Sequence, residues 1–482
     1  MRQRIGLLLL LGTVVALPSA TAATYVVTKT ADTEDGACDQ DCSLREAILA
    51  ANGDSEASTV LLGTGVYLIQ RPGAGEDAGH NGDFDVSGDL ILRGVNPKDT
   101  ILDGNDLDRV LHNLTGALVL ENLTVRNGTT NGSGGGILSD RFDSSLRLES
   151  VVIADNVAAD NGGGIMAFNF QAFRSAIVRN QAGELGGGVF AGGTKLENLT
   201  VSGNRALSLG GGLFLAVDFG DTYTNLTVTA NQGGGIYGDQ PTCPSDPTCF
   251  PDTYLSNSIV AGNLGGPDCS GGIGSGGFNI YGILPGCGVD DSDRTGKAFQ
   301  PLDPLLGPLT DAGGFTPVHP LLPGSPALDT ANPQSCPALD QRGAARPADG
   351  DGNGEARCDV GAFEQTDGCV PDATTLCLAG NRFRVTAQWH TSAASGTARA
   401  VPLTDTSGTF WFFSPDNVEL IAKTVDGCSL NQHHWFFITG LTNVGVHIDV
   451  LDTKTGVSTF YENNLSEPFR PILDTSALAT CP

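Results

Sequence analysis

The sequence predicts an all-β protein: a right-handed parallel β-helix solenoid with an N-terminal capping helix, followed by a small antiparallel β-sandwich. Three observations support this fold class. Glycine triplets recur at a nearly constant interval, an apolar alternation ending in asparagine precedes most of them, and short alternating strands fill the C-terminal region. These patterns divide the chain into a signal peptide at 1–22, a β-helix with its N-terminal cap at 23–298 and repeats over about 113–280, a closing segment of the β-helix at 299–368, and a C-terminal β-sandwich at 369–482.

The first 22 residues predict a secretory signal peptide. Arg2 and Arg4 precede an apolar run, and Ala20-Thr21-Ala22 has the small-x-small pattern of a cleavage site. The run is too short for a membrane span, and no later segment is apolar over a sufficient length. We therefore expect an extracellular or cell-surface protein that has no transmembrane segment once the signal is removed.

The chain is strongly acidic. Its net charge is −28, and loss of Arg2 and Arg4 with the signal peptide makes it −30. Binding of phosphate backbones needs clustered Lys and Arg, so this balance argues against nucleic acid or anionic membranes as partners and favours divalent cations. The 12 cysteines of an exported chain predict disulfides rather than metal sites. Among the connectivities that the sequence leaves open, local pairs are favoured: Cys38–Cys42, Cys243–Cys249, Cys269–Cys287 and Cys336–Cys358.

Residues 24–53 predict a strand and then a short capping helix. TYVVTKT (24–30) has the composition of a strand, and CSLREAILAANG (42–53) that of a helix. Ser43 and Glu46 form a capping box, and Asn52-Gly53 is a helix stop. Because a stacked solenoid leaves its apolar interior open at both ends, this helix is expected to cover the first coil.

The glycine triplets define the repeat. They occur in GGGIL (134–138), GGGIM (162–166), GGGVF (186–190), GGGLF (210–214) and GGGIY (233–237), at intervals of 28, 24, 24 and 23 residues. Stacked coils place each turn on the equivalent turn below it at the strand spacing of about 4.8 Å. Each coil must then have, at the same point of its turn, a backbone that is left-handed or lies very close to the next coil. Glycine meets that requirement because it has no Cβ and adopts positive φ freely.

An asparagine follows each apolar alternation, at Asn127, Asn156, Asn180, Asn204, Asn231 and Asn263. Asparagine tolerates the left-handed region, and stacked amides can hydrogen-bond along the axis. Two other architectures share part of this pattern. LENLTVSGN (196–204) also fits a leucine-rich repeat, but glycines replace the leucines that should follow the asparagine. A calcium-binding β-roll needs aspartates after the glycines, and none stands there.

The C-terminal region predicts a sandwich. Six short alternating strands are expected at 383–389, 408–413, 418–425, 434–440, 444–452 and 456–462.

Two end motifs carry a resemblance to known families. YVVTKTADTEDGACDQDCSLREAILAAN (25–52) resembles the CSLREA-type N-terminal segment of exported bacterial proteins. GSPALDTANPQSCPALDQRGAARPADGDGNGEARCDVGAFE (324–364) resembles the closing segment of the choice-of-anchor Q family, which is similar to pectate-lyase-like β-helices. The glycine and asparagine repeats are similar to those of polymorphic outer-membrane proteins. The resemblance covers about residues 24–364 and implies an exported right-handed β-helix.

The end of the chain departs from those families. Anchored members would be expected to finish in a sorting signal or a hydrophobic tail, whereas this sequence ends in SALATCP. Attachment through an anchor that a partner supplies therefore stays open as one hypothesis.

One acidic loop is a candidate calcium site. In DGDGNG (349–354), Asp349, Asp351 and Asn353 occupy the first, third and fifth places of a calcium loop, and Gly354 the sixth. The twelfth place, where a bidentate acid is expected, is Val360. The alternative is a polar turn of the closing segment. Calcium is the one cofactor that the sequence suggests, with these three residues as its ligands.

A second acidic region is a candidate catalytic site. Asp83 and Asp85 lie two apart on an expected strand, Asp89 follows, and the next coil holds Asp103 and a second cluster, Asp106, Asp108 and Arg109. Paired carboxylates beside a basic residue suit glycoside hydrolysis or polysaccharide lyase chemistry. Acids are abundant throughout the chain, however, so the same residues could simply shape turns.

These patterns favour a function in binding rather than catalysis, and no catalytic residue is assigned. We expect a surface-associated or released β-helix protein that acts as a structural, adhesive or glycan-binding module, with a polysaccharide or cell-surface glycan as its partner. The alternative is a polysaccharide lyase or glycoside hydrolase of pectate-lyase-like architecture.

Overall fold

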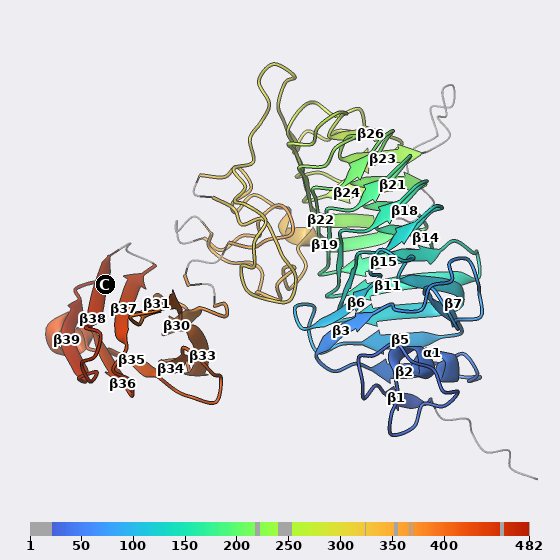
Figure 1. Cartoon of the computed structure of the whole chain (residues 1–482). Coiled ribbons are helices and arrows are strands. Elements are labelled where there is room, and N and C mark those ends of the chain that lie inside the picture. Colours follow the sequence, from blue (N-terminus) through green and yellow to red (C-terminus); the bar gives the residue numbers. More distant parts are fainter. Residues whose placement is uncertain are drawn as a thin grey trace, which may run out of the picture.

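The computed structural model describes residues 22–216, 222–239, 253–322, 324–350, 355–365, 368–369, 371–453 and 457–481. Over these residues the chain forms a parallel β-helix, a largely irregular segment along its side, and an antiparallel β-sandwich (Figure 1). The predicted fold class is confirmed. The predicted signal peptide, apart from Ala22, and the predicted pair Cys243–Cys249 lie outside the described residues.

Helix α1 (Leu44–Ala51) covers the N-terminal end of the solenoid, beside β2 in Figure 1. Ser43 accepts a hydrogen bond from the backbone N–H of Glu46, and the Glu46 carboxylate accepts one from the N–H of Ser43, so the predicted capping box is present. The helix buries Leu44, Ala47 and Ile48 in the core of the first coils. The sequence pattern therefore identified the cap correctly.

The strands of the solenoid form four parallel ladders. The first ladder runs through β1 (Thr24–Val26), β2 (Ser58–Leu61), β5 (Leu90–Arg93), β7 (Leu111–Glu121), β11 (Ser144–Glu149), β15 (Phe170–Phe173), β19 (Lys195–Ser202), β22 (Thr222–Thr229), β24 (Tyr254–Ser256) and β27 (Gly274–Ser275). The second ladder runs through β3 (Gly65–Leu68), β6 (Thr100–Asp103), β8 (Thr124–Arg126), β12 (Val152–Ala154), β16 (Ala176–Val178), the ends of β19 and β22, β25 (Ile259–Val260), β28 (Ile280–Tyr281) and β29 (Arg294–Thr295).

The third ladder contains the strands that follow the glycine triplets. It runs through β4 (Phe84–Ser87), the start of β7, β10 (Ile137–Ser139), β14 (Ile165–Phe168), β18 (Val189–Gly192), β21 (Leu213–Ala216), β23 (Ile236–Asp239) and β26 (Cys269–Gly271). The short fourth ladder contains β9 (Thr129–Thr130), β13 (Val157–Ala158), β17 (Gln181–Ala182) and β20 (Arg205–Ala206). The ladders begin well before the predicted repeats, because the earlier coils stack without a glycine triplet.

The glycine triplets stack as predicted, and two different constraints apply within each. The first glycine is left-handed, with a φ of 65° at Gly162. The second has no room for a side chain, because a Cβ at Gly163 would lie 2.4 Å from the carbonyl oxygen of Gly187 in the next coil. The same contact relates Gly187 to Gly211. One column of glycines therefore runs along the solenoid.

The asparagines form an internal ladder. The side-chain amide of Asn180 donates to Oδ1 of Asn204 at 3.0 Å, and that of Asn204 donates to Asn231 at 3.0 Å. The ladder also includes Asn156 and Asn263. The predicted stacking is confirmed, but the expected left-handed backbone occurs only at Asn127. In the later coils the preceding residue takes that conformation: Asp155, Arg179, Gly203, Ala230 and Gly262.

The segment 299–365 lies along the side of the solenoid rather than over its open end. Thr316 donates to the carbonyl of Arg174, and His319 contacts Ser202. The side-chain amide of Asn225 donates to the carbonyls of Asp359 and Gly361. Beyond the short 3-10 helix η1 (Pro333–Ser335) and isolated β-bridges, the described part of the segment has no regular structure. The many prolines of the stretch 300–324 favour an extended course in the sequence, and these contacts along the coils agree with it.

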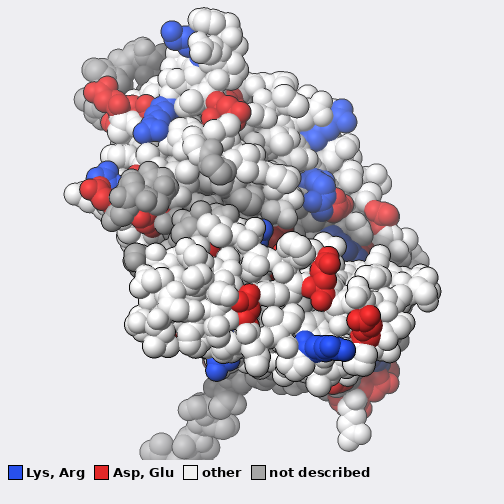
Figure 2. All heavy atoms as spheres, turned by 90° about the vertical axis from the view of Figure 1, so that its left-hand side faces the viewer, with Lys and Arg blue, Asp and Glu red and all other residues white. Residues whose placement is uncertain are grey.

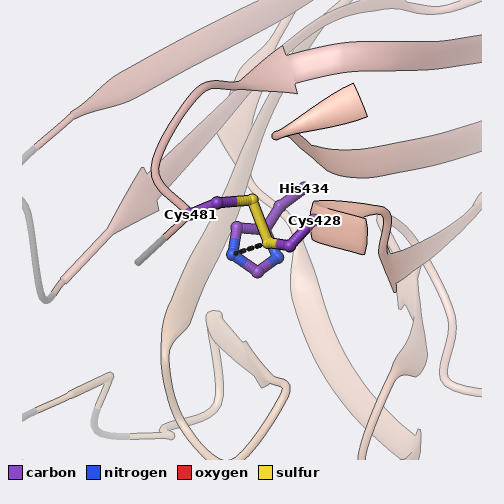
Figure 3. Close-up of side chains that lie close together, drawn as sticks. All are labelled: Cys428, His434 and Cys481. Atoms are coloured by element: carbon purple, nitrogen blue, oxygen red, sulfur yellow. Dashed lines mark hydrogen bonds between the residues drawn. A yellow bond between two sulfur atoms is a disulfide. The ribbon is translucent and has the colours of Figure 1, made fainter. Parts of the chain in front are cut away.

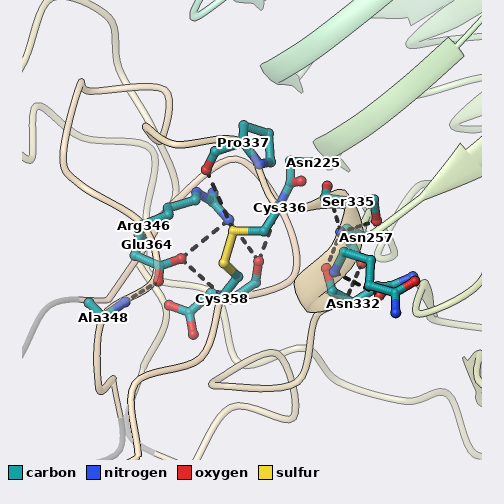
Figure 4. The surroundings of a disulfide bond; sticks show 12 residues. Asn225, Asn257, Asn332, Ser335, Cys336, Pro337, Arg346, Ala348, Cys358 and Glu364 are labelled. Atoms are coloured by element: carbon teal, nitrogen blue, oxygen red, sulfur yellow. Dashed lines mark hydrogen bonds and ion pairs between the residues drawn. A yellow bond between two sulfur atoms is a disulfide. The ribbon is translucent and has the colours of Figure 1, made fainter.

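A disulfide and a buried ion pair hold this segment together (Figure 4). Cys336 is bonded to Cys358, and the guanidinium of Arg346 lies 3.2 Å from the carboxylate of Glu364. Both charged side chains are fully buried. Arg346 also donates to the carbonyls of Asp359 and Gly361, the same two that accept from Asn225. The network therefore joins the segment to the solenoid.

The C-terminal region is a sandwich of two antiparallel sheets. One contains β30 (Thr375–Leu378), β31 (Phe383–His390), β37 (Gly445–Asp452), β38 (Ser458–Asn463) and β32 (Ser395–Thr397). The other contains β33 (Arg399–Thr404), β34 (Ser407–Trp411), β35 (Leu420–Asp426), β36 (His434–Gly440) and β39 (Ile472–Leu478). A single-turn helix, α2 (Cys428–Asn431), joins β35 to β36. The core contains Phe383, Phe410 and Phe436. All six predicted strands are present.

Five disulfides join the described cysteines. The predicted pairs Cys38–Cys42, Cys269–Cys287 and Cys336–Cys358 are confirmed. Two more pairs, Cys369–Cys377 and Cys428–Cys481, lie in the sandwich. Within the described residues, the helices are too short to cross a membrane.

Candidate functional site

One outward row of side chains on the third ladder combines the features expected of a functional surface. Strand residues alternate between the two faces of a sheet, and Ile165, Val189 and Leu213 point into the core. The residue after each of them points outward, and the strand register aligns these residues. We call this row the outward column: Asp85, His112, Leu138, Met166, Phe190, Phe214 and Tyr237.

The upper part of the outward column is aromatic. The rings of Phe190 and Phe214 stack with centroids 4.8 Å apart, and those of Phe214 and Tyr237 with centroids 5.1 Å apart. Phe214 is 5 % exposed because it lies between two rings, whereas Phe190 and Tyr237 are half-buried. The register partner beyond Tyr237 is Ser270, so among the described residues the strand register places no further ring on that end of the stack.

A second aromatic pair lies next to this column. Phe168 is on β14, two residues after Met166, and therefore on the same face. Phe142, in the loop before β11, stacks on it with centroids 5.5 Å apart and an interplanar angle of 9°. Phe142 is 90 % exposed. One face of its ring is thus covered by Phe168 and the other is open to solvent.

The lower end of the outward column is polar. Nδ1 of His112 lies 3.4 Å from Oδ1 of Asp85 and 3.6 Å from Oδ1 of Asp77. The strand register brings Asp85 and His112 together, and the loop between β3 and β4 brings Asp77 to them. Oδ2 of Asp85 accepts a hydrogen bond from the N–H of Gly79 at 2.9 Å. Burial raises the pKa of Asp85, and the nearby His112 opposes that rise.

Two residues of the candidate catalytic region, Asp83 and Arg109, do meet. Nε of Arg109 lies 3.1 Å from Oδ2 of Asp83. Burial, reinforced by the neighbouring carboxylate of Asp85, raises the pKa of Asp83 to about 8 despite the opposing charge of Arg109. Asp83 and Asp85 are only 3 % and 1 % exposed. Both carboxylates are therefore almost entirely shielded from solvent.

The other acids of that region have structural partners. Asp103 lies on the second ladder, where it pairs with Arg126 at 2.7 Å and accepts from the amide of Asn127. Asp89 accepts from the N–H of Ala117, and Asp108 from the N–H of Arg109. Asp103 does not join the group around Asp83 in these contacts. The interpretation of these acids as turn-shaping residues fits them better than a catalytic role.

The predicted calcium loop is described only in part. Asp349 lies in the segment along the solenoid and is half-buried, whereas Asp351 and Asn353 lie outside the described residues. The neighbouring Asp359 is fully buried and accepts from the N–H groups of Asp329 and Gln365. Its carboxylate is therefore already engaged by the backbone, and calcium binding at 349–354 stays a prediction.

A group of sulfur and nitrogen atoms in the sandwich resembles a metal site but is not one (Figure 3). Cys428 and Cys481 form a disulfide, so neither sulfur is a thiolate that could bind an ion. Nε2 of His434 lies 3.5 Å from Sγ of Cys428, and its ring packs on Phe383. The histidine here has a packing role.

The face of the molecule drawn in Figure 2 has few charges, and they are mixed. Lys and Arg side chains occur singly or beside Asp and Glu, and no basic patch gathers on this face. It offers no concentrated positive charge for a phosphate backbone.

The sequence contained the signal for the outward column, but sequence reasoning did not use it. The fifth residue of each glycine repeat is Leu138, Met166, Phe190, Phe214 or Tyr237, which is large and apolar every time. An apolar residue is expected wherever a strand side chain points into the core. The fifth residue of each repeat points outward, so an apolar residue there is unexpected. The polar end was missed because Asp77 and His112 are 35 residues apart and only the register and a loop bring them together.

Comparisons with protein-family models, with curated proteins and with solved structures find no match for this chain. The candidate site therefore depends on its own geometry: an aromatic surface at one end of the outward column and a buried carboxylate beside a histidine at the other.

Proposed function

We propose that this protein is exported and binds a polysaccharide or cell-surface glycan along the outward column, as a structural or adhesive module without a reaction of its own. The observation that carries this proposal is Phe142, whose ring is 90 % exposed and is held parallel to that of Phe168. Leaving a large apolar ring in water is unfavourable. A ring fixed in that position supports a role in contact with a partner.

The chemistry of the surface favours a sugar. Pyranose rings present apolar C–H faces that pack on an open aromatic face, while their hydroxyls stay in water. Phe142 and Tyr237 have such faces, at different levels of the solenoid. The solenoid sets these levels at multiples of about 4.8 Å. A rigid surface with rings at fixed intervals suits an extended, repetitive ligand.

The test is retention on a panel of plant and bacterial glycans, with and without calcium. Phe142→Ala removes the exposed ring and is expected to weaken retention at least about tenfold, roughly 1.4 kcal/mol. Phe299→Ala is the matched control, because Phe299 is 84 % exposed but follows β29, outside the outward column. Equal retention of both variants and the unaltered chain, or no retention of any, would contradict the proposal.

Polysaccharide lyase or glycoside hydrolase activity is the second candidate, and the pair Asp83–Arg109 beside Asp85 is what favours it. A carboxyl group whose pKa lies near 8 can donate a proton at neutral pH. The same glycan panel, assayed for new reducing or unsaturated ends, distinguishes the candidates. New ends that disappear in Asp83→Asn would establish cleavage, and retention without new ends would support binding alone.

Export is the remaining part of the proposal. The sequence of the first 22 residues and the five disulfides support it, because disulfides persist in oxidising compartments. Fractionation of producing cells into medium, surface and periplasm checks it. Full release into the medium would reject a surface anchor, and retention in the cytoplasm would reject export.

A further inference from the structure

We propose that Asp77, Asp85 and His112 form a binding site for a divalent transition-metal ion of the Zn²⁺ type. The site is at the polar end of the outward column, where the loop between β3 and β4 meets β4 and β7. Its test is separate from that of the proposed glycan binding, because the metal ligands lie at the polar end of the outward column and the exposed aromatic rings lie away from it.

The distances between the three donor atoms fit a small ion. Zinc binds imidazole nitrogen and carboxylate oxygen at about 2.0–2.2 Å, so tetrahedral ligands are separated by roughly 3.3–3.6 Å. Nδ1 of His112 lies 3.4 Å from Oδ1 of Asp85 and 3.6 Å from Oδ1 of Asp77. All three donor atoms lie within 4.8 Å of one another. Asp77 is on a loop and its side chain is exposed, so its carboxylate has room to adjust to an ion.

The buried carboxylate of Asp85 is the second observation that points to a ligand. Its side chain is 1 % exposed, and Oδ1 has no hydrogen-bond partner. The Nδ1 atom of His112 is close enough for an ion pair, but the geometry does not make a hydrogen bond. A buried carboxylate oxygen without a hydrogen-bond partner is unfavourable. A cation between Asp77 and His112 would satisfy it.

A backbone hydrogen bond holds the Asp85 side chain in one orientation, as a metal ligand requires. Its other oxygen, Oδ2, accepts from the N–H of Gly79, which orients Oδ1 toward His112. Hydrogen bonds from outer groups to a liganding carboxylate typically tune metal affinity. Asp77 is on the loop and its side chain is 59 % exposed, so an ion has a path to the site from solvent. The fourth position is left for water.

The donor set selects the class of ion. Calcium and magnesium prefer oxygen ligands, whereas imidazole suits zinc and its transition-metal neighbours. Two carboxylates also neutralise the charge of a divalent ion when the imidazole is neutral. Glu76 lies near Asp85, and Asp83 beside them is flanked by Arg109 and Asp108. The ion pair of Asp83 with Arg109 keeps that carboxylate engaged outside the site.

Titration of the full-length, chelator-treated protein with Zn²⁺ alone tests the proposal, with equilibrium dialysis as the readout. We expect one ion per chain at this site. Loss of a group that only supports a ligand typically weakens metal binding roughly 10–100-fold. His112 and Asp85 are proposed as direct ligands, so His112→Gln and Asp85→Asn should each weaken Zn²⁺ binding by more than that. Co²⁺ gives an independent readout, because the intense visible absorption of four-coordinate cobalt should appear in the unaltered protein and be lost in His112→Gln.

The matched control is His447→Gln. His447 also lies between two carboxylates, with Nδ1 3.0 Å from Glu462 and Nε2 3.2 Å from Asp449, but its two nitrogens face different acids and share no ion position. This variant should keep the site intact. Asp77→Asn provides a variant that leaves the core untouched should Asp85→Asn fail to fold. Binding that survives His112→Gln and Asp77→Asn, or no binding at all, would overturn the site.

Discussion

Glycine and asparagine have different roles in each coil. The column through Gly163, Gly187 and Gly211 exists because carbonyl oxygens of adjacent coils occupy the space that a Cβ would need. The ladder through Asn180 and Asn204 exists because the turn leaves buried backbone groups that an amide can satisfy. Sequence reasoning assigned both columns and noted that asparagine tolerates the left-handed region. From Asn156 onward, the residue before the asparagine takes that conformation instead.

Gly163→Ala should destabilise the solenoid severely. The new Cβ would lie 2.3 Å from the carbonyl carbon of Gln181 and 2.4 Å from the carbonyl oxygen of Gly187, and neither backbone can move independently of its coil. We expect a loss of about 3 kcal/mol or more in the free energy of unfolding. Denaturant unfolding followed by far-UV circular dichroism measures it.

Gly88→Ala is the control for that experiment. A Cβ at Gly88 would have no heavy atom within 4 Å, and its φ is not left-handed. The substitution should change the free energy of unfolding by less than about 0.5 kcal/mol. Similar losses in the two variants would show that close approach does not explain the glycine column.

Protonation of His319 should weaken the lateral segment at acidic pH. Burial lowers the pKa of His319 from 6.5, while Nδ1 lies 2.8 Å from the carbonyl oxygen of Gly307 and Nε2 2.9 Å from Oγ of Ser202. A histidine with a lowered folded pKa contributes stability that is present above about pH 6.5 and is lost as the pH falls toward its folded pKa. The midpoint temperature of thermal unfolding should therefore fall further between pH 7.5 and pH 5 in the unaltered chain than in His319→Gln. Identical differences would argue against this residue as the cause.

At the scale of elements, the segment 299–365 is the least regular part and the one that the sequence described least well. Its prolines predicted an extended course, and the contacts of Thr316 and His319 agree with that. Its resemblance to the closing segment of a β-helix did not say where the segment packs, and it lies along the side. No periodicity encodes that position, because it depends on single contacts such as those of Asn225 with Asp359.

The disulfide Cys336–Cys358 should hold this segment in place. It closes a loop between residues 22 apart in sequence, and such a link stabilises by about 3 kcal/mol, mainly by restricting the unfolded chain. The double variant Cys336→Ser/Cys358→Ser should be cleaved by protease within 299–365 faster than the unaltered chain. The matching variant Cys428→Ser/Cys481→Ser should leave that cleavage rate unchanged. Equal rates in all three proteins would show that other contacts alone hold the segment.

At the scale of the whole molecule, the solenoid and the sandwich have separate cores. The core of the solenoid extends along the stacked coils, whereas the sandwich buries Phe383, Phe410 and Phe436 between its own two sheets. The alternating strands of each part were predictable, because burial on one face dictates a period of two. The outward column and the ligands at its polar end were not, since they follow from register between coils.

Residues 369–482 should fold alone. They contain a complete core and two disulfides, and all three tryptophans of the chain, Trp389, Trp411 and Trp435. In the full chain, tryptophan fluorescence should therefore follow a different unfolding transition from far-UV circular dichroism, and the isolated region should reproduce the fluorescence transition. Coincident transitions in the full chain together with an unfolded isolated region would contradict separate cores.

The register of the third ladder is what the proposed glycan surface and the proposed metal site both require. Chemical cross-linking of paired cysteine variants measures it most directly. Phe190 and Phe214 are register partners, so Phe190→Cys/Phe214→Cys should be joined in high yield by a short thiol-bridging reagent. Phe190→Cys/Ala216→Cys lies on the same face but diagonally, at a Cα separation of roughly 7–8 Å, and should be joined poorly. Equal yields, or efficient joining of Phe190→Cys with Leu213→Cys, would mean that the coils do not stack in this register and that the outward column does not exist.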